Sequence, residues 1–167
     1  IDLHLEPDGP AGVKAIGPGI MNGAGGIILS LSDLEHHDLI NDLAEYTLTT
    51  GLNVREDGGY GLFFGPLSGF LSLSLIAKKY PCLKTILNNH LPNTLEAHAK
   101  VSRSNRFSDL SHGFIGSILI LNYLKKQKWL SGQDLVSEAL VSERQKLRSS
   151  VERMLQLRFK GVLHGCE

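Results

Sequence analysis

The chain has 167 residues, of which 42% are hydrophobic, and its 17 basic and 17 acidic side chains leave a formal net charge of zero. This composition is typical of one globular domain and argues against a disordered chain. Without a basic excess we expect no nucleic-acid partner, and the apolar runs are interrupted too early to span a membrane.

The two cysteines, Cys82 and Cys166, lie far apart in the sequence. Such spacing is not that of a disulfide-stapled secreted domain. The first residues also lack the basic and apolar stretches of a signal peptide. We therefore expect a cytoplasmic protein.

In chain order, a loop rich in Gly and Pro comes first and ends in a glycine-rich turn around Gly23. The apolar run from Ile27 to Leu34 follows it and predicts a buried helix, because a helix that is apolar on most faces is buried. The next segment predicts an amphipathic helix, since apolar residues recur there with helical spacing. These residues are Leu39, Leu43, Tyr46 and Thr47.

The same plan is repeated along the chain. A second turn, Gly65 to Gly69, precedes a predicted buried helix from Phe70 to Ala77. The segment from Pro92 to Ser108 predicts only a short helix, Leu95 to Val101, and then a polar linker.

A third turn, Gly113 to Gly116, opens a predicted buried helix that extends to Leu124. An amphipathic helix should follow from Ser131 or Gly132 to about Phe159. Its basic residues alternate with acidic ones and predict a solvated face. The acidic residues are Glu138, Glu143 and Glu152.

The glycine turns recur at intervals of roughly 40–50 residues, which is the length of one helical hairpin. They contain Gly23, Gly65 and Gly113, and a fourth segment, Gly161 to Gly165, follows the same plan. Buried and half-exposed helices alternate between the turns. The sequence therefore predicts an all-α fold, an arc of about three helical hairpins with the apolar helices inside.

Two segments resemble repeats of the lanthionine synthetase C-like (lantibiotic cyclase) family. Residues 108–116 resemble its aromatic-Asp-x-x-x-Gly-x-x-Gly repeat, with Asp109 at the family's functional Asp and Ser108 in place of the aromatic residue. Residues 161–165 resemble the next repeat, Gly-x-x-His-Gly, with His164 at its functional His. The resemblance implies an α/α toroid, here an incomplete ring.

The resemblance also implies an activity. Family members add cysteine thiols of a precursor peptide to dehydroalanine or dehydrobutyrine and so form thioether rings. The addition leaves an enolate that needs a proton, which a His or a carboxylate can supply or relay. Asp109, His164 and His112 are the candidate catalytic residues, with a modified peptide as the partner.

The zinc ligands of the family have no counterpart here. They are a Cys in a later Trp-Cys-x-Gly repeat and an adjacent Cys-His pair, whereas His164 follows Leu163. We therefore interpret residues 1–167 as a partial domain, truncated at its C-terminal side. No metal or other cofactor is expected in this fragment, which alone should be inactive, and zinc is expected in a full-length zinc-type member.

Other interpretations stay open. Asp109 could be a helix cap, and His112 and His164 could bond a neighbouring loop. The chain could be a non-catalytic peptide-binding toroid, or another ring of hairpins such as a glycan-processing (α/α)₆ enzyme. The last would need paired carboxylates at the ring centre, and Asp109 has no acidic partner at an equivalent turn.

Overall fold

The computed structural model describes residues 16–21, 23–32, 37–53, 60–104 and 108–163. For His37, Ser104 and residues 157–163 it describes the backbone alone. All regular structure in these ranges is helical, apart from one isolated β-bridge between Gly17 and Gly23. The helices are α1 (Ala24–Leu31), α2 (His37–Leu52), α3 (Gly65–Ile76), α4 (Cys82–Ser104), α5 (Phe114–Lys125) and α6 (Gln133–Leu163).

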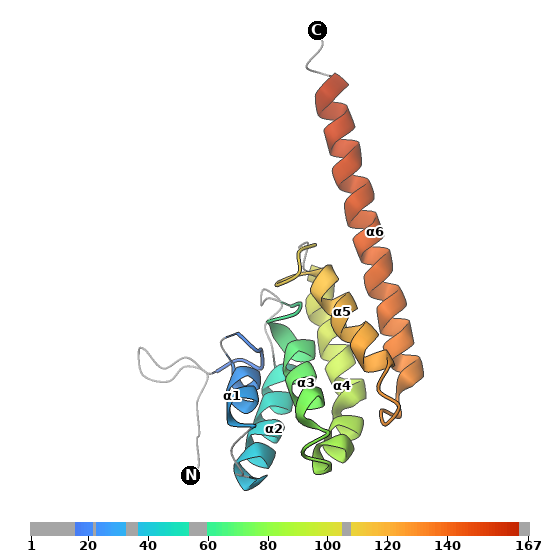
Figure 1. Cartoon of the computed structure of the whole chain (residues 1–167). Coiled ribbons are helices and arrows are strands. Elements are labelled where there is room, and N and C mark those ends of the chain that lie inside the picture. The colour runs from blue at the N-terminus through green and yellow to red at the C-terminus, as the bar shows by residue number, and fades with distance from the viewer. Residues whose placement is uncertain (1–15, 22, 33–36, 54–59, 105–107, 164–167) are drawn as a thin grey trace.

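The helices form three consecutive hairpins, α1–α2, α3–α4 and α5–α6, which succeed one another across Figure 1. Helices α1, α3 and α5 pack side by side in chain order, and we call them the inner layer. Helix α4 packs between α2 and α6 in a second, outer layer. The predicted all-α fold is confirmed, and so is the start of a helix at each of the first three glycine turns. The prediction that these helices are buried holds for α3 alone, because α1 exposes Ile27 and α5 exposes Ile115 and Leu119 to solvent.

Helix α3 lies at the centre of the core. Every one of its residues is buried except Leu75. Its sequence is apolar or small on all faces, so it can be covered on all faces at once. Phe70 and Leu73 are fully buried there, and Ile28 of α1 and Ile40 of α2 belong to the same cluster.

The prediction for residues 92–108 was wrong in extent. These residues begin inside α4, a helix that runs without interruption from Cys82 to Ser104 and contains Pro92. A buried leucine recurs at every fourth residue on one face of α4, at Leu83, Leu87, Leu91 and Leu95. Burial of this stripe stabilises the helix on both sides of the proline and outweighs its cost.

Helix α6 also differs from the prediction, because it continues to Leu163 and extends well past the ends of the other helices (Figure 1). Residues 161–163 are therefore helical, although a glycine turn was expected there. His164 itself lies outside the described residues. No helix in the described part of the chain is long and apolar enough to cross a membrane.

Candidate functional site

The glycine turns need their small residues because the chain folds back over the start of each inner helix. A Cβ atom on Gly26 would collide with the carbonyl oxygen of Ile20, six residues earlier. A Cβ atom on Gly116 would collide in the same way with the carbonyl oxygen of Leu110. These two turns therefore share one backbone arrangement, as the repeat predicted.

In the second turn Ser68, not Gly69, takes the place of the second glycine. Its hydroxyl donates a hydrogen bond of 2.9 Å to the carbonyl oxygen of Leu62, again six residues earlier. The same hydroxyl accepts a bond of 3.1 Å from the backbone N–H of Ile20 in the first turn. The second repeat thus has the Gly-x-x-small spacing of the others, starting at Gly65.

Neighbouring turns touch through their backbones. The N–H of Met21 donates to the carbonyl oxygen of Phe63 at 3.4 Å, and the N–H of Leu62 donates to that of Leu110 at 3.1 Å. Gly61 has a φ of 139°, which favours glycine, and a Cβ atom there would come within 2.6 Å of the oxygen of Ser111. The three turns therefore form one continuous edge of the inner layer.

Asp109 occupies a distinctive place on this edge. It lies four residues before Gly113, and the equivalent positions in the first two turns are Gly19 and Gly61. Each of those glycines lies against the turn that follows it, Gly19 against Phe63 and Gly61 against Ser111. In the third turn a carboxylate replaces the glycine.

The carboxylate of Asp109 is held by its own turn. Its Oδ1 accepts a 2.7 Å hydrogen bond from the backbone N–H of His112 and a 3.0 Å bond from the hydroxyl of Ser111. The bond from the His112 N–H is the main cause that lowers the pKa of Asp109 below its ordinary value. The residue does not cap α5, whose N-cap is Gly113 without a side-chain bond. Asp109 is therefore an ionised carboxylate in a fixed position at neutral pH.

His112 lies directly beside it. The distance between its Nδ1 and Oδ1 of Asp109 is 3.7 Å, and both side chains are about half exposed. The imidazole also stacks on the ring of Phe64, with centroids 4.4 Å apart and planes 16° apart. Nδ1 faces the carboxylate, so Nε2 is the nitrogen that can exchange a proton with a bound molecule.

Of the three predicted catalytic residues, the structure brings Asp109 and His112 together. His164 lies outside the described residues, so its predicted proximity to Asp109 stays a prediction. Phe64 was not predicted as part of the site. It directly precedes the glycine of the second turn, as His112 does in the third, which is the signal in the repeat that pairs them.

A buried polar network lies between α4 and α6, where a solvated face was predicted. Glu143 is buried, and its Oε1 accepts hydrogen bonds from Ser102 at 2.6 Å and Lys146 at 2.7 Å, with Nε2 of His98 at 3.5 Å. Burial alone would raise the pKa of Glu143, but the nearby His98, followed by Lys146 and Ser102, outweighs it and lowers the pKa from 4.5 to about 2.

We compared the chain with protein-family models, curated proteins and solved structures. No match was found. The described residues also contain no group of three or more His, Cys, Asp or Glu side chains that could hold a metal ion. The candidate site therefore depends on the geometry of the turns and on the Asp109–His112 pair.

Proposed function

We propose that the chain is part of a lanthionine synthetase C-like cyclase, which adds cysteine thiols to dehydroalanine or dehydrobutyrine in a peptide. The observation that carries this proposal is the Asp109–His112 pair, with Oδ1 and Nδ1 3.7 Å apart on the third glycine turn. Two features support the fold of that family. The hairpins form an inner and an outer layer, and the glycine turns line one edge of the inner layer.

In this chemistry the thiol loses its proton and the thiolate sulfur forms a bond to Cβ of the dehydroamino acid. The electrons of the Cα–Cβ double bond move toward the carbonyl and leave an enolate. That enolate takes up one proton at Cα, so the product has the same composition as the substrate. We assign the donation of this proton to Nε2 of His112.

Asp109 is assigned as a positioning residue. Its carboxylate faces Nδ1 of His112 at 3.7 Å and so orients the ring, which leaves Nε2 for the bound peptide. Phe64 limits the rotation of the ring by stacking on it. His164 keeps the role implied by the resemblance, as a second group of the proton relay on the following turn.

Zinc activates the thiol in the family, but the described residues do not fit a zinc site, since they contain no cluster of suitable ligands. We therefore derive no step through zinc. The roles of Asp109 and His112 concern the proton of the enolate alone.

Replacing Asp109 by Asn or His112 by Gln should each slow thioether formation, on the order of 100-fold, because general acid catalysis typically contributes that much. The rate of product formation is measured for each variant of the full-length protein. His90→Gln is the matched control. His90 also faces a carboxylate, with 3.4 Å between its Nε2 and Oε2 of Glu45, but it lies between the outer helices α2 and α4.

Full activity of both Asp109→Asn and His112→Gln would remove the catalytic assignment. If His90→Gln slowed thioether formation as much, the loss of activity in the other two variants would reflect damage to the fold and not to the site. Binding of a dehydrated peptide without any turnover in the unmodified protein would favour a non-catalytic peptide-binding toroid.

A further inference from the structure

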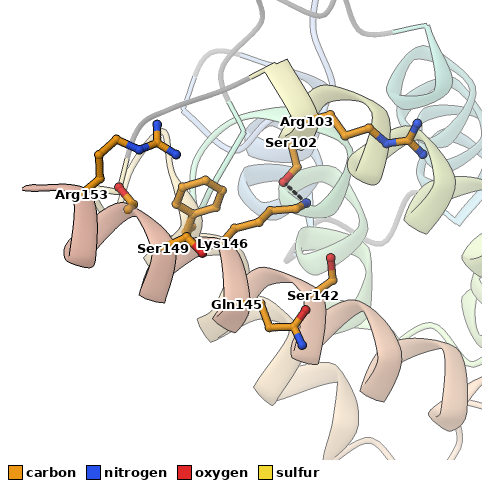
Figure 2. Close-up of a pocket in the computed structure, with 9 residues that line it drawn as sticks. Ser102, Arg103, Ser142, Gln145, Lys146, Ser149 and Arg153 are labelled. Atoms are coloured by element: carbon orange, nitrogen blue, oxygen red, sulfur yellow. Dashed lines mark hydrogen bonds between the residues drawn. The ribbon is translucent and has the colours of Figure 1, made fainter.

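A pocket of about 600 Å³ lies where α4, the start of α5 and the middle of α6 meet. It is separate from the Asp109–His112 pair, neither member of which lines it. Figure 2 shows Lys146 reaching across it to Ser102, with Arg103 and Arg153 on opposite sides. Its lining includes Ser102, Arg103, Phe114, Lys146, Ser149 and Arg153.

The buried network described above holds Lys146 in the pocket. The ammonium group donates to Oγ of Ser102 at 2.6 Å and to Oε1 of Glu143 at 2.7 Å. Ser102 and Glu143 are both buried, so neither partner can move far. Lys146 itself is partly exposed on the pocket side, and its position is set before any ligand arrives.

The charges of the lining are unbalanced. Glu143 does not line the pocket, and its carboxylate neutralises the charge of Lys146. No carboxylate in the described part of the chain forms an ion pair with Arg103 or Arg153. Among the described residues that line the pocket, none has an acidic side chain. The hydroxyls of Ser142, Ser149 and Ser150 and the amide of Gln145 can also donate hydrogen bonds, whereas the hydroxyl of Ser102 already donates to Glu143.

We propose that this pocket binds a phosphate monoester. The arginine and lysine side chains and several hydroxyls together offer more hydrogen-bond donors than the two oxygens of a carboxylate can accept. A phosphate group accepts more hydrogen bonds than a carboxylate and so fits this set of donors better. The volume exceeds that of a phosphate group alone, and Phe114 supplies an apolar wall for an attached organic group. The assignment does not depend on the proposed cyclase activity.

Isothermal titration of the protein as its gene encodes it tests this assignment with four probes: inorganic phosphate, O-phosphoserine, glycerol phosphate and acetate. We expect both phosphate esters to bind, and acetate to bind at least about tenfold more weakly, because it lacks the additional acceptor oxygens. Preference for O-phosphoserine would identify a phosphopeptide as the source, and preference for glycerol phosphate a small metabolite.

Arg153→Gln and Arg103→Gln should each weaken the binding of the esters about tenfold through the loss of a charged donor. Both residues are exposed, so these variants should fold. Arg148→Gln is the matched control, because Arg148 lies on the same helix, pairs with Glu152 at 2.9 Å and does not line the pocket. The assignment is overturned if neither ester binds at millimolar concentration, if acetate binds as tightly, or if Arg148→Gln weakens binding as much.

Discussion

Replacing Gly116 by alanine should destabilise the fold by about 3 kcal/mol or more, at the upper end of the cost of overpacking. The added methyl group would collide with the carbonyl oxygen of Leu110 and with the backbone N of Leu62. Both are backbone atoms that hydrogen-bond to each other across two turns, so neither can move without disturbing the other. Thermal or urea unfolding followed by circular dichroism measures the loss.

The matched control is Gly17→Ala. A Cβ atom on Gly17 would have no neighbouring atom within 4 Å. The free energy of unfolding of this variant should therefore lie within about 0.5 kcal/mol of that of the unmodified protein. If Gly116→Ala were as stable as Gly17→Ala, the third turn would not lie against α5 as described, and the stacked edge of glycine turns would be wrong.

The second large effect concerns Glu143. Glu143→Gln should lower the free energy of unfolding at neutral pH on the order of 3 kcal/mol, because it removes the buried charge of a partly buried ion pair and leaves Lys146 without its only charged partner among the described residues. Oε1 of Glu143 is also the acceptor for the hydroxyl of Ser102, at 2.6 Å. Urea unfolding at pH 7 tests the value.

Glu143 should also determine part of the decrease in the free energy of unfolding at acidic pH. The pKa of Glu143 is about 2 in the folded chain and 4.5 as its ordinary value, so the unfolded chain binds the proton first on acidification. Its contribution to stability should be complete above about pH 4.5 and decline as the pH falls toward 2. Glu143→Gln should lack this part of the pH dependence.

Glu152→Gln serves as the control for both measurements. Glu152 pairs with Arg148 on the exposed side of α6, where a salt bridge contributes about 0–1 kcal/mol. If the two variants had the same stability and the same acid profile, the network of Glu143 would not be buried between α4 and α6.

The sequence predicts most of the architecture because the signals for it are local. A glycine turn followed by an apolar run identifies α1, α3 and α5 within a few residues of their observed starts. The extent of α4 was missed because Pro92 and the polar residues after it conceal a stripe of leucines spaced four apart. Here tertiary burial outweighs local propensity.

The pair Asp109 and His112 could be proposed from one short motif, since both belong to the same turn. The stacking partner Phe64 could not, because it comes from the turn of the preceding hairpin. The buried network was missed because polar residues on a charged helix usually face solvent. A signal was present, since Glu143 continues the stripe of Val136 and Leu140 on α6.

The most direct measurement uses a peptide that contains one cysteine and one dehydroalanine, incubated with the protein as its gene encodes it. Intramolecular addition forms a C–S bond without a change in composition. We therefore expect that the free thiol is lost, as shown by resistance to alkylation, while the mass of the peptide stays the same. A thiol that remains fully alkylatable after incubation, at the rate of a sample without protein, would contradict the proposed cyclase function.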